Sequence, residues 1–237
     1  MKQRKRREIM KKAVRIIVLV VLSGLILGLV IYNAYHQPPI SEEVWDEGTT
    51  IGDSETATRH YVQYSDLACP YCDVFTRLTI ENEEEFSQYL ADHQILFEIR
   101  LTEMLFDSVG SEISRDSAVA AYCARREGKF VDYYHAGVMA LYEDYHSKGI
   151  GDSKTAPKIT GMADDYWLEI GHKLGLGEEF DSCVGNQETL SEVAKNTKKA
   201  EQQASGLPFF QFDKYTFAGF DNTWGWEYVV RYLDAGL

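Results

Sequence analysis

The sequence predicts an α/β domain that contains a large helical insertion and follows a single membrane-spanning helix. An uncharged apolar stretch occupies residues 16–35. Strand patterns occur near both ends of the remaining chain, whereas the residues between them show only helical periodicity. We therefore expect a basic head (1–15), a transmembrane anchor (16–35), a linker (36–56) and a domain (57–237) whose helical insertion covers about residues 106–204.

The charge of the chain is divided sharply between its two ends. The 237 residues include 24 Lys+Arg and 37 Asp+Glu, which gives a formal net charge of −13. Residues 1–15 contain eight of the basic residues and one acid, which leaves 16 basic and 36 acidic residues, a net charge of −20, for the rest. A body this acidic repels phosphate backbones, so we expect no nucleic-acid partner.

The apolar stretch reads IIVLVVLSGLILGLVIYNAY, and a helix needs about 20 apolar residues to cross a bilayer. The basic head should stay in the cytoplasm, which places the domain outside the cell membrane on a single-pass anchor. The alternative is a cleaved signal peptide. Such a peptide has a shorter apolar region, about 7–15 residues, and small residues at its cleavage site, whereas this stretch ends with Tyr32 and Tyr35. We favour the anchor.

The helices and strands of the domain are predicted from the residues that break them, such as Pro, and from the periodicity of apolar residues between these breaks. Gln37-Pro38-Pro39 ends the apolar helix, and the residues from there to 56 are acidic with little apolar periodicity, as in a tether. Strands are predicted over four segments: 59–64, 95–101, 209–212 and 216–220. Helices are predicted from 70 to about 90 and over five segments of the insertion: 114–127, 130–147, 162–174, 178–185 and 187–204. Asn222 or Thr223 should cap a last helix that ends near residue 234.

A Cys-Pro-Tyr-Cys motif lies where the first strand meets the following helix. At a helix N-terminus the sulfur of Cys69 meets unpaired backbone N–H groups and the positive end of the helix dipole, which stabilise a thiolate. Cys72 is one turn further in, close enough to attack a mixed disulfide and release the bound partner. The spacing therefore predicts thiol–disulfide exchange, with Cys69 as the exposed exchanging sulfur and Cys72 as the resolving thiol.

Other interpretations of the four cysteines exist. Cys69 and Cys72 could be half of a zinc site, but no second Cys/His pair occurs at short spacing, so we expect no metal. They could also form an inert disulfide. Cys123 and Cys183 lie on apolar helix faces, where free cysteines act as small hydrophobes. An extracytoplasmic location favours a structural disulfide between these two instead.

Four segments carry a family resemblance. The strand residues YVQYSD (61–66) that lead into Cys69-Pro70-Tyr71-Cys72 resemble the active-site entry of the DsbA family of thiol:disulfide oxidoreductases. The helical stretch AAYCARREGKF (120–130), the Leu174-Gly175-Leu176 turn and the segment GLPFF (206–210) are also similar. The resemblance covers about residues 57–237 and implies a thioredoxin fold with an inserted helical domain.

The resemblance also implies a substrate site. In the family a proline in the cis form lies beside the active site, which here would be Pro208. The backbone of Leu207 would then pair with a substrate chain lying across the sulfur of Cys69. Pro70 and Tyr71, between the two cysteines, would contact the same substrate.

The activity implied by the resemblance is disulfide formation in exported polypeptides. No bound cofactor is expected, because the Cys69–Cys72 disulfide is itself the redox group. The implied partners are unfolded or partly folded exported proteins and a membrane oxidase of the DsbB or vitamin-K-epoxide-reductase kind that restores the disulfide. Two alternatives remain: a reductase or isomerase of the same fold, and a non-catalytic, membrane-anchored binding module.

Three positions depart from the family pattern. Leu207 replaces the Val or Thr that often precedes the cis-proline. Gln63 stands six residues before Cys69, where some members carry a buried acid, so proton transfer at Cys72 would use water or another group. Tyr71 replaces the histidine of the most oxidising members, which should give a less oxidising protein, below about −120 mV.

Overall fold

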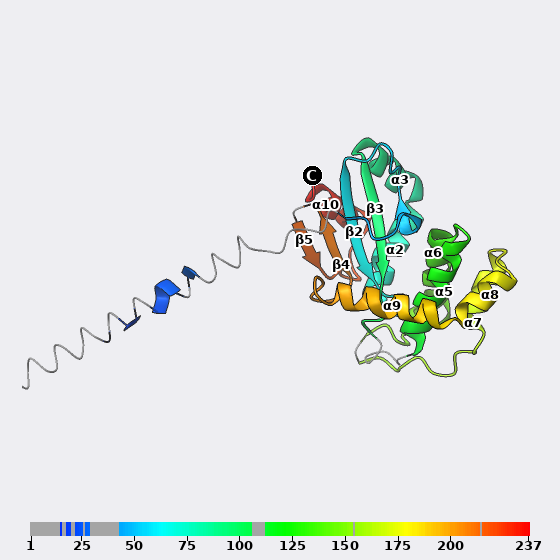
Figure 1. The fold of residues 1–237 in the computed structure, drawn as a ribbon. Helices are drawn as coiled ribbons and strands as arrows, with labels where there is room; N and C mark the ends of the chain where they lie inside the picture. Colours follow the sequence, from blue (N-terminus) through cyan, green and yellow to red (C-terminus); the bar gives the residue numbers. More distant parts are fainter. Residues whose placement is uncertain are drawn as a thin grey trace, which may run out of the picture. The chain divides into compact units, whose positions relative to one another are not determined.

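The computed structural model describes residues 43–105, 112–153, 155–213 and 215–237, with isolated positions between 15 and 28. Most of the expected basic head, 1–15, and most of the expected anchor, 16–35, lie outside the described residues. Within the part of the chain that is described, no helix is both long enough and apolar enough to cross a membrane. Residues Glu42–Leu237 form one compact unit, which is shown in Figure 1.

The centre of this unit is a sheet of five strands within the described residues. Their order is β1-β3-β2-β4-β5. The bounds are Thr50–Ile51 (β1), Arg59–Ser65 (β2), Ile95–Leu101 (β3), Phe209–Phe212 (β4) and Tyr215–Ala218 (β5). Strands β2 and β3 are parallel and the other pairs are antiparallel. The predicted strands therefore exist, the last one shifted to Tyr215–Ala218.

Helices surround the sheet and form the insertion. After the first βα junction come α2 (Pro70–Glu81) and α3 (Glu83–Asp92), and the chain ends in α10 (Trp226–Asp234). The insertion contains α5 (Glu112–Arg126), α6 (Phe130–Asp144), the short 3-10 turn η2 (His146–Lys148), α7 (Tyr166–Lys173), α8 (Glu178–Val184) and α9 (Gln187–Ala200). In Figure 1 helices α5, α6, α7 and α8 lie to one side of the sheet, whereas α9 extends under the sheet in this view. The helix predicted from 70 to about 90 is two helices, which meet at Asn82.

Both faces of the central strand β2 are covered. Alternating side chains of a strand point to opposite faces. On one face Tyr61 packs in the main core with rings of α2 and β4, such as Phe75 and Phe210. On the other face Val62 and Tyr64 pack against Ala200 at the end of α9. This double cover explains why a strand rich in tyrosine is buried almost throughout.

The expected linker, 36–56, is wrong from residue 43 onward, because this segment belongs to the folded domain. Strand β1 pairs with β3, and Thr49 before it is buried. The carboxylate of Glu98 accepts hydrogen bonds from the backbone N–H groups of Trp45, at 2.8 Å, and Asp46, at 3.2 Å. The guanidinium of Arg100 lies 4.0 Å from the ring centroid of Trp45. Buried charges of β3 thus hold the acidic segment in place, a long-range interaction that composition does not reveal.

The expected cap of the last helix is also wrong. Helix α10 begins at Trp226 and its N-cap is Gly225, with no side-chain cap. The Asp221 carboxylate instead accepts hydrogen bonds from the backbone N–H of Thr223, at 2.8 Å, and from its hydroxyl, at 2.7 Å. Both polar groups of Thr223 are therefore hydrogen-bonded in a local turn that precedes the helix, so Thr223 does not cap it.

Candidate active site at the start of helix α2

Cys69 is the N-cap of α2, and Pro70 is the first residue of the helix. The Cys69 sulfur accepts a hydrogen bond from the backbone N–H of Cys72 at 3.4 Å. The sulfur therefore takes the place of a capping oxygen, at the positive end of the helix dipole, which favours negative charge there. Proline is tolerated at this first position because its missing N–H would have no partner within the helix.

The two thiols are free in this structure, and they differ in surroundings. Burial raises the pKa of the Cys72 thiol well above its ordinary value, and the hydrogen bond with Cys69 and the negative charge of a Cys69 thiolate raise it further. Cys72 therefore holds its proton. The expectation of an exposed Cys69 is wrong for this conformation, because Cys69 is only 2% exposed and Tyr71 beside it is 39% exposed.

Cys69 lines a pocket of about 440 Å³. The pocket brings together four of the predicted site residues: Cys69, Pro70, Tyr71 and Leu207. The other lining residues come from neighbouring loops: Leu105, Gly151, Ser153, Ala156, Lys158 and Gly206. Most of these side chains are small or apolar, and Lys158 is the one charged residue in this set. That the loop 151–158 lines this pocket could not be predicted from the sequence, because its position beside Cys69 depends on how the insertion packs.

The segment before β4 forms one wall of the pocket. The peptide bond between Leu207 and Pro208 is cis, the form that the family resemblance implies. Pro208 is buried, and its carbonyl accepts a hydrogen bond from the backbone N–H of Gly219 at 2.7 Å. Leu207 is half-buried and reaches the pocket. Strand β4, which starts at the next residue, fixes this wall against β2.

A buried carboxylate lies directly before the motif and was not assigned a role from the sequence. Asp66 is 0% exposed, and its carboxylate accepts hydrogen bonds from the backbone N–H groups of Ala68, at 2.9 Å, and Leu105, at 3.1 Å, and from the hydroxyl of Ser114. Burial raises the pKa of Asp66 to about 6, although these hydrogen bonds oppose the rise. Asp66 lies within the strand-exit segment that carried the family resemblance, so its position gave a signal.

Gln63, the departure noted from the sequence, is buried as well. It is 1% exposed and pairs in register with Phe210 of β4. Its side-chain Nε2 has no hydrogen-bond partner among the described residues. An amide has no titratable proton in this pH range, so Gln63 cannot serve as an acid or a base.

Polar side chains hold α2 to the insertion. The hydroxyl of Tyr134 in α6 lies 2.8 Å from the hydroxyls of both Ser65 and Thr76, which links β2, α2 and α6. One turn before Thr76 in α2, the carboxylate of Asp73 lies 3.0 Å from the imidazole Nδ1 of buried His146. These contacts fix the orientation of the helix that carries both cysteines.

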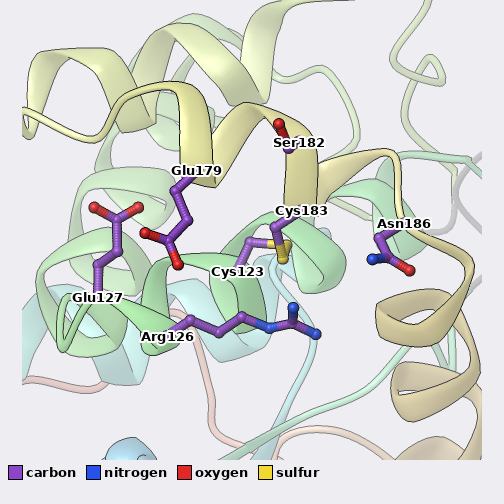
Figure 2. A pocket seen from close by; sticks show the side chains of 7 residues that line it. All are labelled: Cys123, Arg126, Glu127, Glu179, Ser182, Cys183 and Asn186. Atoms are coloured by element: carbon purple, nitrogen blue, oxygen red, sulfur yellow. A yellow bond between two sulfur atoms is a disulfide. The ribbon is translucent and has the colours of Figure 1, made fainter.

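The second cysteine pair is bonded. Cys123 of α5 and Cys183 of α8 form a disulfide with an S–S distance of 2.04 Å. The hydroxyl of Thr189, in the first turn of α9, lies 3.4 Å from the Cys183 sulfur, and it is the donor because a bonded sulfur carries no hydrogen. Both cysteines line a pocket of about 350 Å³, and Figure 2 shows the bond among the lining side chains. No lining residue of this pocket also lines the one at Cys69.

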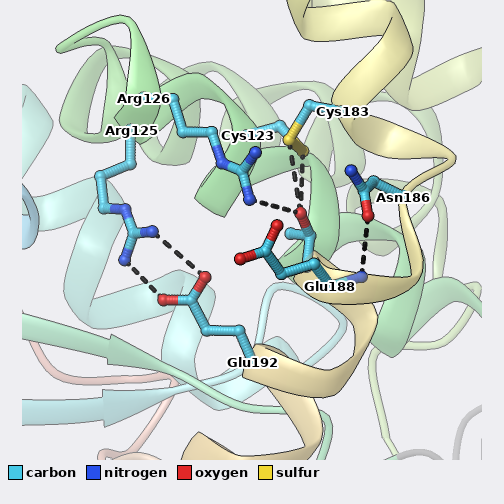
Figure 3. Close-up of a disulfide and its surroundings, with 8 residues drawn as sticks. Cys123, Arg125, Arg126, Cys183, Asn186, Glu188 and Glu192 are labelled. Atoms are coloured by element: carbon cyan, nitrogen blue, oxygen red, sulfur yellow. Dashed lines mark hydrogen bonds and ion pairs between the residues drawn. A yellow bond between two sulfur atoms is a disulfide. The ribbon is translucent and has the colours of Figure 1, made fainter.

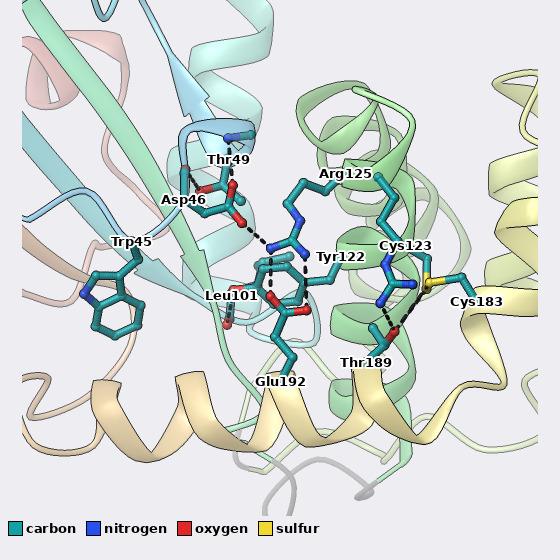
Figure 4. A network of polar contacts seen from close by, with 12 residues as sticks. Trp45, Asp46, Thr49, Leu101, Tyr122, Cys123, Arg125, Cys183, Thr189 and Glu192 are labelled. Atoms are coloured by element: carbon teal, nitrogen blue, oxygen red, sulfur yellow. Dashed lines mark hydrogen bonds and ion pairs between the residues drawn. A yellow bond between two sulfur atoms is a disulfide. The ribbon is translucent and has the colours of Figure 1, made fainter.

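A polar network extends from this disulfide to the N-terminal segment. Arg125 forms hydrogen bonds of 2.8 and 3.2 Å with the carboxylate of Glu192, as Figure 3 shows. Arg125 also pairs with Asp46 (Figure 4). Arg126, labelled in Figure 3, donates to the hydroxyl of Thr189 at 3.1 Å. The network joins α5, α9 and the segment before β1. It is a structural link between the insertion and the sheet.

Over the described ranges, no group of three or more His, Cys, Asp or Glu side chains is arranged to hold a metal ion.

Comparisons with known proteins agree with this architecture. The thiol-disulfide exchange protein alpha-DsbA2 from Wolbachia pipientis superimposes with a TM-score of 0.57 at 16% identity, covering 86% of this chain and 92% of that chain. A periplasmic thioredoxin-like protein from Salmonella enterica serovar Typhimurium gives 0.56 at 16% identity, over 81% and 92%. The catalytic domain of Proteus mirabilis ScsC gives 0.56 at 13% identity, over 86% and 96%.

At these identities the solved structures establish the fold: a thioredoxin-like, DsbA-like α/β domain with a helical insertion. No curated protein matches the chain. A family model described as thioredoxin matches residues 46–213, which begins inside the segment that the structure adds to the domain. Because this match covers well over half of the sequence, the chain belongs to the thioredoxin family.

Proposed function

We infer that this protein is a membrane-anchored, extracytoplasmic thiol:disulfide oxidoreductase that forms disulfides in exported proteins. The observation that carries the proposal is the position of the Cys69 sulfur. It caps α2, accepts the N–H of Cys72 and opens into a largely apolar pocket. A helix N-terminus favours negative charge on such a sulfur, and the pocket leaves room for a partner beside Cys69, whereas a merely structural bridge requires neither property.

The reaction follows from the different environments of the two sulfurs. In the disulfide form, a substrate thiolate attacks the Cys69 sulfur, the Cys69–Cys72 bond breaks, and Cys72 leaves with the electron pair and takes up a proton. A second substrate thiolate then attacks the substrate sulfur, and Cys69 leaves as a thiolate. The substrate loses two electrons, which remain on the reduced Cys69 and Cys72. The cysteines carry the electrons, so the proposal requires no organic cofactor.

The pocket supports a polypeptide as substrate. Leu105, Ala156 and Leu207 offer apolar surface beside the Cys69 sulfur, and Tyr71 stands exposed at its rim. Leu207, next to the cis-proline, would present its backbone to an extended chain. Such a surface suits apolar segments of unfolded proteins, which are exposed before folding and buried after it.

Location and partners are part of the same proposal. The apolar stretch 16–35 behind a basic head supports a single-pass anchor with the domain outside. The fold shared with a periplasmic thioredoxin-like protein is in line with this location. A protein that donates disulfides must be reoxidised, so we propose a membrane oxidase of the DsbB or vitamin-K-epoxide-reductase kind as its partner.

The test is the equilibrium reduction potential of the full chain, purified from membranes in detergent and titrated against glutathione. A potential between about −180 and −120 mV would support a donor of disulfides, and one near −270 mV would instead support a reductase. No exchange at all would favour the anchored binding module.

Two matched variants identify the sulfurs and the partners. Cys72→Ser should trap disulfide-linked complexes with exported proteins, because the bound substrate cannot be released by the second cysteine. Cys69→Ser should trap none. Recovery of the wild-type chain in the soluble fraction, without carbonate or detergent extraction, would refute the anchor.

A further inference from the structure

We propose that Lys158 selects substrates for the pocket beside Cys69: it favours polypeptides that carry an acidic residue two positions away from the cysteine that reacts with Cys69. This inference rests on the proposed function and deepens it, because it names the class of segment that suits the site. The preferred segment is an extended chain with a cysteine, apolar neighbours and one carboxylate.

The charge of the pocket comes from one side chain. Among the described lining residues Lys158 is the one basic residue, and none of them is acidic. Asp152, from the same loop, does not line the pocket. The volume of about 440 Å³ lies within the usual range of binding pockets, about 300–1,000 Å³. A substrate side chain that enters therefore meets a largely apolar surface and one ammonium group.

The backbone on both sides of Lys158 is held in place. The carbonyl of Pro157 accepts a hydrogen bond from the backbone N–H of Gly151 at 2.8 Å, which closes the base of the loop 151–158. Ile159 is 6% exposed and packs in the main core. Gly151 has a φ of 69°, and a Cβ there would lie 2.9 Å from Cγ1 of Ile159, so glycine permits both the turn and the close packing. Lys158 therefore has a fixed place on the pocket wall, although its side chain is exposed.

The positive charge of Lys158 is not neutralised by any described residue. Other cations of the insertion are paired, such as Lys129 with Asp132 at 2.8 Å and Arg115 with Glu103 at 2.8 Å. In the part of the chain that the structure describes, no carboxylate forms such a pair with Lys158. A carboxylate supplied by a substrate would fill this position.

The surroundings of the pocket strengthen the contrast in charge. Residues 16–237 carry a net charge of −20, which repels acidic substrates at long range. Salt screens interactions between exposed charges that are further apart than about 8 Å at an ionic strength of about 0.15 M. Within the pocket the nearby charge is that of Lys158, and the N-terminus of α2 at Cys69 has the same sign. An acidic side chain is therefore attracted once it has entered.

The geometry of an extended chain sets the position of the acidic residue. Neighbouring residues are about 3.3 Å apart, and successive side chains point to opposite faces. When a substrate cysteine points toward Cys69, the side chains two positions before and after it point the same way, about 7 Å along the chain. Side chains one position away point outward. A carboxylate two positions from the cysteine can thus share the pocket with Lys158, which lines it together with Cys69.

The test compares short peptides that contain one cysteine and differ at a single position. That position holds Glu, Gln or Lys, either one or two residues before or after the cysteine. Full-length protein with the Cys69–Cys72 disulfide is mixed with excess peptide in non-ionic detergent and quenched with acid, and mass spectrometry counts the reduced protein. Each rate is divided by the rate of the same peptide with uncharged bis(2-hydroxyethyl) disulfide, which removes the effect of the substitution on the peptide thiol itself.

The wild type should react about 1.5- to 5-fold faster with a Glu peptide than with the Gln peptide, the range for one exposed ion pair, and more slowly with the Lys peptide. This preference should occur two positions from the cysteine, on the side that faces Lys158, and be absent one position away. In Lys158→Glu the order should reverse. Equal rates for Glu and Lys peptides at every position in the wild type would overturn the inference.

Lys173→Glu, in α7, is the matched control. It changes the net charge of the chain by the same amount, at an exposed residue that does not line the pocket. This variant should keep the order of the wild type. If it reversed the order as Lys158→Glu does, the preference would come from the overall charge of the domain, and the role of Lys158 would be refuted.

Peptides with serine in place of the cysteine separate this inference from the proposed function. They cannot exchange, so fluorescence polarisation of labelled peptides reports binding to the pocket alone. If no cysteine peptide exchanges, the proposed function fails. In that case tighter binding of the Glu form to the wild type, and of the Lys form to Lys158→Glu, would still support the selection by Lys158, whereas equal binding of both forms to the wild type would refute it.

Discussion

Removal of the Cys123–Cys183 disulfide should lower the stability of the folded domain by about 4 kcal/mol. The two cysteines are 60 residues apart in the sequence. For a loop of this size the chain-entropy relation gives about −14 cal/mol/K for the unfolded state, which is about 4 kcal/mol at 25 °C. In a domain of 150–250 residues each kcal/mol lowers the melting temperature by about 2–4 °C. The Cys123→Ala/Cys183→Ala variant should therefore melt about 8–16 °C below the wild type.

The assay is thermal unfolding of the full chain, followed by circular dichroism with Cys69 and Cys72 kept oxidised in both proteins. Thr189→Val serves as the matched control, because it removes the hydroxyl beside the sulfurs and leaves the bond intact. Its effect should be about 1 kcal/mol, the typical value of one hydrogen bond. A decrease below about 3 °C for the double variant, or an equal decrease for the control, would refute the loop-entropy argument.

Three further outcomes follow from buried groups and from the domain boundary. A carboxyl whose pKa is raised on folding stabilises the folded state at a pH below its ordinary pKa. This contribution is lost as the pH rises through the pKa that the group has in the folded state. Wild-type protein should therefore lose stability relative to Asp66→Asn between about pH 4 and pH 6, as measured by urea titrations. A difference that is constant with pH would contradict this. Arg100→Leu should cost about 3–5 kcal/mol, because it leaves the buried Glu98 carboxylate without its 2.6 Å partner; a cost below 1 kcal/mol in urea would count against the role of this pair. A chain that starts at residue 57 lacks β1 and Trp45 and should melt several degrees below one that starts at residue 43, and equal melting would show that this segment adds nothing.

The parts of the fold that the sequence predicted are those encoded locally. Alternation in 59–64 and 95–101 reflects strands whose side chains fill both faces of a covered sheet. Pro70 directly after Cys69 marked a helix start, and the structure has Cys69 as the N-cap. These signals depend on residues that are close in the chain, so they can be read without knowledge of the tertiary structure.

The parts that were missed depend on contacts between distant residues. Strand β1 is two residues long and lies in an acidic segment, and its place is set by Glu98 and Arg100, which are about 50 residues away. The family resemblance drew attention to the segment that contains Asp66, but its burial and bonding depend on the distant residues Leu105 and Ser114. The pocket wall at Gly151 likewise results from how the insertion packs.

The pairing of β2 with β4 also determines when the active site can be assembled. Tyr61 pairs with Phe212, so the whole insertion must be made before the central strand gains its second neighbour. Contacts of such high sequence separation form late, and chains are synthesised from the N-terminus. Cys69 and Cys72 leave the ribosome long before Leu207, whereas Cys123 and Cys183 can meet within the insertion alone. The Cys123–Cys183 bridge can therefore close before the pocket around Cys69 exists, and that pocket is assembled only when the chain is nearly complete.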